Sequence, residues 1–138
     1  MDAVTHSLLG LGNFALYFIS SLLLLLIFKF LYTRITPHDE WRLVKEEKSS
    51  AAAIGLVGAV IGFSIAVGSA ASNSVSIIDF WIWGAVALVA QVMAFGIIRF
   101  VFVPKIVQRI NDNEVSAGIV LGGFSVAVGI LNAACMTY

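Results

Sequence analysis

The sequence predicts an all-α membrane protein, in which four transmembrane helices form two parallel two-helix repeats within a single domain that covers residues 1–138. Three observations lead there. Hydrophobic residues make up 60% of the chain and charged residues only 12%, about half the charge of a soluble domain. Four apolar stretches are long enough to cross a bilayer. A glycine-rich motif occurs in two of them. This composition excludes a soluble monomer and a disordered chain, and the zero net charge gives no sign of binding to nucleic acid.

The four apolar stretches cover about residues 11–31, 51–71, 78–103 and 115–136. A hydrocarbon core of about 30 Å requires about 20 residues of helix. Inside lipid each backbone N–H and C=O must find a partner within the protein, so helices are required. Five consecutive leucines in the first stretch lack the alternation of barrel strands. The start of the chain carries no Lys or Arg, so we expect a retained helix rather than a cleaved signal peptide.

Positive charges surround only two of the three loops. The first loop region has five and the third has three: Lys29, Arg34, Arg42, Lys45, Lys48, Arg99, Lys105 and Arg109. Because Lys and Arg are retained on the cytoplasmic side, we predict that both loops are cytoplasmic and that both termini face outward.

An internal repeat relates the second and fourth stretches. Residues 62–68 (GFSIAVG) and 123–129 (GFSVAVG) are identical at six of seven positions. Residues 52–58 also align with 117–123, in a register that differs by four residues, so the alignment stays open. The predicted units cover about residues 8–73 and 78–138. With two spans each, they are parallel repeats. A duplicated hairpin that packs well is the simpler interpretation, and a pathway between the halves is the functional one.

Small residues predict how the helices pack. Gly58 and Gly62 lie four residues apart in the second span, as do Gly118 and Gly122 in the fourth. Lipid supplies no hydrophobic force between helices, so their association needs close backbone approach. We therefore expect the second and fourth spans to form the central pair and the bulkier first and third to face lipid. Two glycine faces exceed what one contact needs, which favours a homo-oligomer.

Four polar residues are candidates for a polar pathway. Gln91 lies near the middle of the third span, and Asn73 and Asn132 follow the repeated motif. Asp79 is near the outer end, where capping a helix together with Ser76 is its alternative role. Polar groups inside a membrane are costly and therefore mark candidate sites.

No residue pattern indicates catalysis. The single thiol, Cys135, has only His6 and His38 as possible bases, and His38 is expected on the other side of the membrane. No spacing of His, Asp, Glu or Cys suggests a metal site. We expect no catalytic residue, cofactor or metal.

The first cytoplasmic loop carries helix-start signals. Thr36 suits an N-cap, Pro37 the first helical position, and Asp39 a capping box. Trp41 and the neighbouring lysines are typical of a helix at the headgroup level. The segment is either an interfacial anchor or a docking site for a cytoplasmic partner, formed by Thr36, His38, Asp39, Glu40 and Trp41.

Three segments together resemble the YjfL family of small bacterial inner-membrane proteins of unknown function: residues 35–41 (ITPHDEW), 69–79 (SAASNSVSIID) and 132–137 (NAACMT). The resemblance covers nearly the whole chain. It implies an inner-membrane location, two copies of a two-helix unit, and a possible cytoplasmic partner, a phage-shock-like peripheral protein, which points to envelope stress. The family has no established catalytic residues to carry over.

The sequence thus predicts a multi-pass protein of the bacterial inner membrane with two candidate functions. The leading prediction is a non-enzymatic, oligomeric scaffold in envelope maintenance or stress response, which recruits a peripheral partner through residues 36–48. The alternative is a small channel or transporter for an ion or small solute that uses Gln91, Asn73 and Asn132.

Overall fold

The computed structural model describes residues 2–36 and 40–136, and within them it contains helices joined by short loops, without a strand. Its elements in chain order are α1 (Ala3–Ile35), α2 (Glu40–Lys45), α3 (Ser50–Asn73), α4 (Ile77–Ile97), the π-helical turn η1 (Ile98–Phe102), α5 (Ile106–Asn111) and α6 (Val115–Cys135). Four helices are long and apolar enough to cross a membrane: Ala3–Ile35, Ser50–Asn73, Ile77–Phe102 and Val115–Cys135. The prediction of an all-helical protein with four candidate spans is confirmed.

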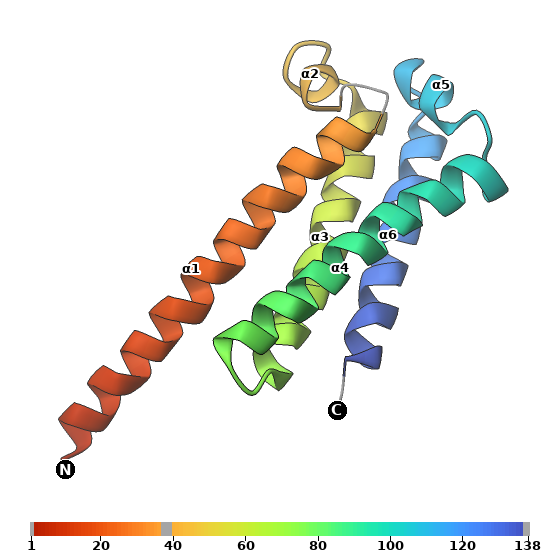
Figure 1. The fold of residues 1–138 in the computed structure, drawn as a ribbon. Helices are drawn as coiled ribbons and strands as arrows, with labels where there is room; N and C mark the ends of the chain where they lie inside the picture. The colour runs from red at the N-terminus through yellow and green to blue at the C-terminus, as the bar shows by residue number, and fades with distance from the viewer. Residues whose placement is uncertain (1, 37–39, 137–138) are drawn as a thin grey trace.

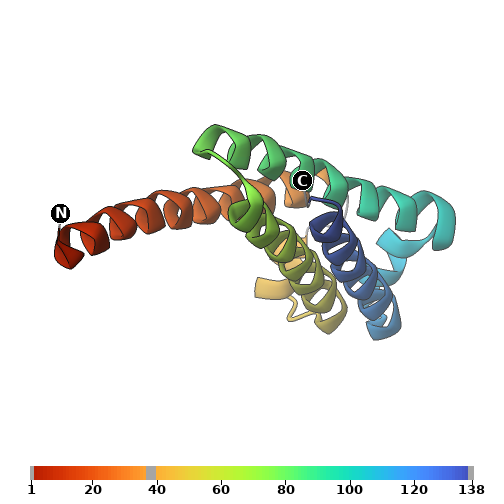
Figure 2. The same ribbon diagram turned by 90° about the horizontal axis from the view of Figure 1, so that it is seen from below.

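The four long helices form two layers. Seen from below, α3 and α6 lie side by side, and α1 and α4 lie across one face of this pair (Figure 2). α3 is the most buried of the four spans. As the glycine pattern predicts, the second and fourth spans form the central pair, and large apolar side chains of α1 and α4 are exposed. The short helices α2 and α5 lie together at one end of the bundle (Figure 1), the end at which the lysines and arginines are found.

The first helix begins earlier than predicted, at Ala3 rather than near residue 11. Asp2 makes this start possible, because its Oδ1 accepts hydrogen bonds from the Thr5 backbone N–H at 2.9 Å and the Thr5 hydroxyl at 2.8 Å. The Thr5 N–H also lowers the pKa of Asp2. The 33 residues of α1 correspond to about 50 Å. The buried residues of this helix all lie in its second half: Ser20, Leu24, Phe28 and Tyr32.

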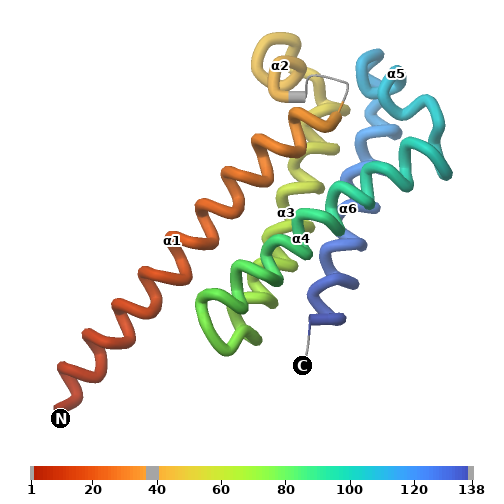
Figure 3. The backbone as a smooth tube through the Cα atoms, in the orientation of Figure 1, coloured from red at the N-terminus to blue at the C-terminus, as the bar shows by residue number. Residues whose placement is uncertain are grey.

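The N-terminal turns of α1, ahead of Tyr17, therefore stand clear of the bundle, as the tube drawing also shows (Figure 3). Beyond that point α1 joins the core through aromatic stacking. The rings of Phe28 and Phe63, from α1 and α3, are 4.5 Å apart and nearly parallel. Tyr17 meets Phe80 at the start of α4, edge to face.

Thr36 ends the first helix, a role that the sequence pattern did not predict, and the predicted helix start at residues 36–39 stays a prediction because it continues outside the described residues. Its hydroxyl donates to the Tyr32 carbonyl at 3.0 Å, as does its backbone N–H, so Thr36 caps the C-terminus of α1. Two physical reasons account for the difference. A residue before proline is disfavoured in helical conformation, which ends α1 ahead of Pro37. The last carbonyls of a helix also need donors. Pro37, His38 and Asp39 lie outside the described residues, and α2 begins at Glu40.

The starts of α3 and α6 resemble each other. The residue before each N-cap, Lys48 or Asn113, has a positive φ (52° and 57°), and the N-caps are Ser49 and Glu114. These positions are 65 residues apart (113 minus 48 and 114 minus 49). The alignment of residues 52–58 with 117–123 has the same offset, whereas that of 62–68 with 123–129 has an offset of 61.

Candidate functional site

Glycines let α3 and α6 touch backbone to backbone. A Cβ added to Gly58 would lie 2.2 Å from the Gly122 Cα, and one added to Gly62 would lie 2.2 Å from the Ser125 carbonyl oxygen. Gly118 is equally close to Ala51. The structure thus brings all four glycines singled out in the sequence to this one contact, where close approach supplies the van der Waals contact that holds helices together in lipid.

A buried polar pair lies where α4 meets α6. Gln91 is fully buried, and its Nε2 donates to the Ser125 carbonyl at 3.3 Å. Within the described part of the chain, neither the Gln91 Oε1 nor the buried Ser125 Oγ has a hydrogen-bond partner. Such a deficit is costly in an apolar interior, which makes this pair the most conspicuous polar feature at the centre of the bundle.

The other predicted polar residues serve different local roles. The Asn73 amide donates to the Ser69 carbonyl at 2.9 Å, and the Ser69 hydroxyl donates to the Ala133 carbonyl on α6 at 2.9 Å. Asp79 closes the start of α4: its Oδ2 accepts from the Val75 N–H, and its own N–H donates to the Ser76 hydroxyl.

Asn132 has a buried Nδ2 without a partner among the described residues. Across those residues no hydrogen bond joins the amides of Gln91, Asn73 and Asn132 to one another. The structure therefore does not gather these side chains into one cluster.

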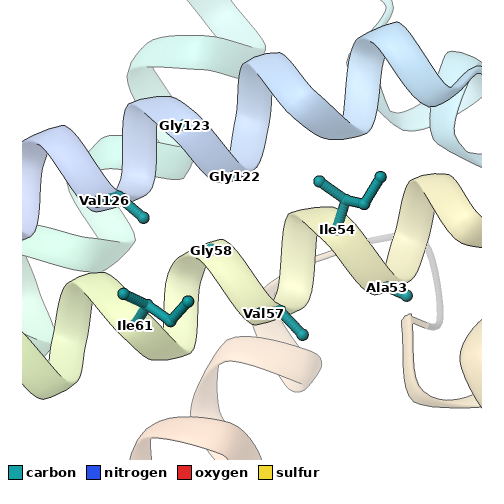
Figure 4. A pocket seen from close by; sticks show the side chains of 8 residues that line it. All are labelled: Ala53, Ile54, Val57, Gly58, Ile61, Gly122, Gly123 and Val126. Carbon is teal, nitrogen blue, oxygen red and sulfur yellow. The ribbon is translucent and has the colours of Figure 1, made fainter.

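A groove follows the α3–α6 contact and is entirely apolar (Figure 4). Its volume is about 360 Å³. It is lined by Ala53, Ile54, Val57, Gly58, Ile61, Gly122, Gly123 and Val126. The glycines form its floor and offer no side-chain polar group, so this groove provides nothing to hold a polar substrate. No group of three or more His, Cys, Asp or Glu side chains that could hold a metal occurs in residues 2–36 and 40–136.

The end of the bundle that carries α2 and α5 presents a fixed charged surface, which we call the basic platform: Lys29, α2 with Lys48, and α5 with Lys105. Leu43 is only 3% exposed and attaches α2 to the bundle, and the Ser49 N–H donates to the Leu43 carbonyl at 2.9 Å. Ile106 and Ile110 are fully buried and attach α5 in the same way. The platform is therefore held by the core.

Trp41 is the exposed centre of the α2 part of the platform. The Lys29 Nζ lies 4.4 Å from the centroid of the Trp41 ring, and the Lys45 Nζ lies 5.9 Å from it. Both distances lie within the range of cation–π attraction. Of the predicted docking residues, Thr36 ends α1, Glu40 opens α2 and Trp41 faces outward, whereas His38 and Asp39 lie outside the described residues. Lys29, which belongs to α1, was not among the predicted residues.

Asn113 is a second residue that sequence reasoning missed. Its Oδ1 accepts from the Ala51 N–H at 3.0 Å and from the Ser49 hydroxyl at 3.1 Å. The Ser49 hydroxyl in turn accepts from the Ala52 N–H at 3.2 Å. Asn113 thus caps a helix in the other half of the chain. The positive φ of Asn113 is a conformation that asparagine adopts more readily than most residues, and this was the only local signal available.

Comparison with known proteins identifies relatives along almost the entire chain. A family model described as Domain of Unknown Function (DUF350) matches residues 6–136. The chain is 40% identical over 133 residues to the UPF0719 inner membrane protein YjfL of Escherichia coli (strain K12), covering 96% of this chain and 99% of that protein. The protein of the same name in Escherichia coli O157:H7 is equally similar. No solved structure matches significantly.

Proposed function

Because the chain belongs to the DUF350 family and is a multi-pass protein of the bacterial inner membrane, we propose that it is a non-enzymatic, homo-oligomeric scaffold that recruits a peripheral protein to the membrane surface in envelope maintenance. The observation that carries this proposal is the basic platform, in which Lys29 and Lys45 flank the exposed Trp41 ring. Such a surface suits an acidic partner, because aromatic residues are enriched at recognition surfaces and complementary charge directs association.

The attachment of the basic platform to the core supports recruitment by a preformed surface rather than by a flexible loop. Leu43, Ile106 and Ile110 are buried in the core, and Asn113 bonds the start of α3 from the third loop. A partner that binds a fixed surface does not have to order it first, which reduces the entropic cost of binding.

The topology belongs to the same proposal. All lysines and arginines lie at or near the platform end, which supports a cytoplasmic platform and an N-out/C-out orientation. Each half has the order long helix, short helix, long helix, and the matching starts of α3 and α6 support two parallel repeats at residues 8–73 and 78–138.

Site-specific photo-crosslinking tests the recruitment. A photoreactive residue is placed at the exposed position Glu46, and the protein is irradiated in inverted membrane vesicles. We expect an adduct with a second protein. In the absence of cross-linking, alkaline carbonate should extract that second protein from the membrane, because it is a peripheral protein. The matched control places the probe at Val75, which is 87% exposed at the opposite end. We expect Lys29→Gln combined with Lys45→Gln to reduce the protein adduct roughly 30-fold, since each surface charge contributes about 1 kcal/mol to attraction by an anionic surface.

Two results would contradict recruitment. Adducts with lipid alone at position 46 would leave α2 as an interfacial anchor. An adduct insensitive to both lysine substitutions would show that the platform does not recognise the partner.

A channel or transporter is the second candidate. The observation that favours it is that Gln91 Oε1, Ser125 Oγ and Asn132 Nδ2 are buried without partners in the described part of the chain, so they are available to a solute that crosses. If this alternative holds, purified protein in liposomes should pass small ions, and Gln91→Leu and Asn132→Leu should each reduce the flux while folding is kept. Absence of flux from well-folded protein would eliminate it.

A further inference from the structure

A groove with apolar walls lies between α1 and α4, the two helices that cross one face of the central pair (Figure 2). This α1–α4 groove has a volume of about 350 Å³, and its walls include Leu31 and Tyr32 from α1 and Val89, Val92 and Met93 from α4. All of its lining side chains are apolar or aromatic. Such walls suit an acyl chain, because hydrocarbon makes dispersion contacts with them and requires no hydrogen bond.

The face of α4 that lines the groove continues as far as Arg99. Gly96 and Arg99 follow Val92 by four and seven residues, and these spacings keep residues on one face of a helix. A Cβ added to Gly96 would meet nothing within 4 Å, so the surface between the groove and Arg99 is open. Seven residues correspond to about 10 Å along a helix. An apolar groove and a guanidinium group therefore follow each other on one helix face.

Arg99 is a cation near the end of a candidate span, and the chain supplies no counter-ion for it. It lies three residues before the end of the span Ile77–Phe102. In the described part of the chain no carboxylate pairs with Arg99, and its guanidinium stacks on the Phe100 ring, 5.1 Å from the ring centroid. A charge inside a span is costly unless it is paired. The long stem of an arginine near a helix end can reach the phosphate level, and its planar fork matches phosphate geometry.

The residues beside Arg99 indicate that the anion comes from lipid. Phe100, Val101 and Phe102 are 73%, 65% and 60% exposed and point in different directions around η1. In a protein of the inner membrane, large apolar side chains at the end of a span are covered by lipid, so a water-soluble acidic protein does not reach between them. A free phosphate ion would leave the groove empty. A phospholipid supplies both a phosphate for Arg99 and an acyl chain for the groove.

We propose that Arg99 and the α1–α4 groove together bind one anionic phospholipid of the leaflet at the platform end. Its phosphate accepts hydrogen bonds from the Arg99 guanidinium, and one acyl chain passes Gly96 and enters the groove. The ten residues from Val89 to Arg99 correspond to about 15 Å, which is half of a hydrocarbon core of about 30 Å. A chain of one leaflet is therefore long enough to lie in the groove.

Charge favours an anionic headgroup over a zwitterionic one. Lys105 is exposed at the start of α5, six residues after Arg99, and makes no ion pair with any described carboxylate. Two cations attract a headgroup with net negative charge, whereas the ammonium of a zwitterionic headgroup is repelled by them. This inference goes beyond the proposed recruitment, because Lys105 is the only one of these residues that belongs to the basic platform.

Photolabelling of the full chain by lipid tests the site. The protein is reconstituted into phosphatidylcholine vesicles that contain a minor fraction of phosphatidylglycerol, and either lipid carries a diazirine in its acyl chain. We expect the phosphatidylglycerol probe to label Leu31, Val89 and Met93 more than the phosphatidylcholine probe does. Arg99→Gln should reduce this labelling roughly fivefold, which corresponds to about 1 kcal/mol for one cation near an anionic lipid. Arg99→Lys, which keeps the charge, should retain most of the labelling.

Two further substitutions serve as a charge control and a test of the acyl-chain path. Lys48→Gln removes the same charge from a position outside the candidate spans and should leave the labelling of the groove nearly unchanged. Gly96→Leu places a side chain between the groove and Arg99 at a position where the fold has room. It should lower labelling by phosphatidylglycerol to the level of the phosphatidylcholine probe. Gly12→Leu is the matched control, because a Cβ there also meets nothing within 4 Å, and unfolding in mixed micelles checks that each variant folds.

Three results would overturn the inference: equal labelling of the groove by both lipid probes, equal losses in Arg99→Gln and Lys48→Gln, or labelling that survives Gly96→Leu. Loss of the phosphatidylglycerol label on addition of inorganic phosphate would assign Arg99 to a soluble anion instead. Failure of the lipid site with an intact protein adduct at position 46 would remove this inference and leave recruitment. Labelling of the groove without that adduct would remove recruitment alone.

Discussion

Gly58→Ala is expected to destabilise the bundle by about 3 kcal/mol, the upper part of the range for overpacking a well-filled interior. The added methyl group would lie 2.2 Å from the Gly122 Cα and 2.4 Å from the Gly122 carbonyl oxygen. Both are backbone atoms, so no side-chain rotation relieves the clash, and α3 and α6 must move apart. Loss of this contact removes one of the close backbone approaches that hold α3 against α6.

The neighbouring glycines Gly122 and Gly123 provide a matched control. A Cβ on Gly122 would lie 2.6 Å from the Ile54 carbonyl oxygen, whereas one on Gly123 would meet nothing within 4 Å. Gly122→Ala should therefore destabilise the protein. Gly123→Ala should be neutral or stabilising by up to about 1 kcal/mol through helix propensity. Equilibrium unfolding in mixed micelles measures both, and equal effects would show that α3 and α6 do not pack as described.

Phe63→Ala is expected to cost about 2 kcal/mol and to loosen α1 from α3. Phe63 and Phe28 are fully buried and stack with ring centroids 4.5 Å apart. In a membrane protein the unfolded helices remain in lipid, so the hydrophobic transfer contribution is small. The remaining cost comes from the cavity and the lost dispersion contacts.

Phe124 is the control for Phe63, because both follow a glycine in the repeated motif. Phe124 is only half-buried, against the exposed Phe102, so Phe124→Ala should cost less than 1 kcal/mol by the same reasoning. Energy transfer between labels on α1 and α3 should fall in Phe63→Ala only. A larger loss of stability in Phe124→Ala would contradict the assignment of α1 to the Phe63 side.

The sequence predicted the spans and the central pair well because their causes are local. Hydropathy over about 20 residues marks a span, and the spacing of Gly58 and Gly62 places both on one helix face. The same reasoning did not foresee that Thr36 caps the end of α1, where Pro37 disfavours helical conformation at the residue before it. It also missed the residues before position 11, because Asp2 caps a segment whose polar residues lower its hydropathy.

The candidate site was less predictable because its contacts are distant in sequence. Asn113 meets Ala51 from 62 residues away, and Lys29 of α1 meets Trp41 of α2. Neither contact is accompanied by a periodic pattern of residues from which it could be predicted. The two repeated phenylalanines show the same limit: an identical local motif has different burial in each half because α1 covers only one of them.

The bond between Asn113 and the start of α3 has a consequence for biosynthesis. The ribosome makes Ala51 long before Asn113. The Ala51 N–H therefore has no Asn113 acceptor until the third loop has been synthesised. In a nascent chain that has inserted only its first hairpin, the Ala51 N–H must bond to water instead, while the Ser49 hydroxyl can already accept from the Ala52 N–H. Completion of translation brings Asn113 to the Ala51 N–H, so the full capping of α3 requires the second hairpin.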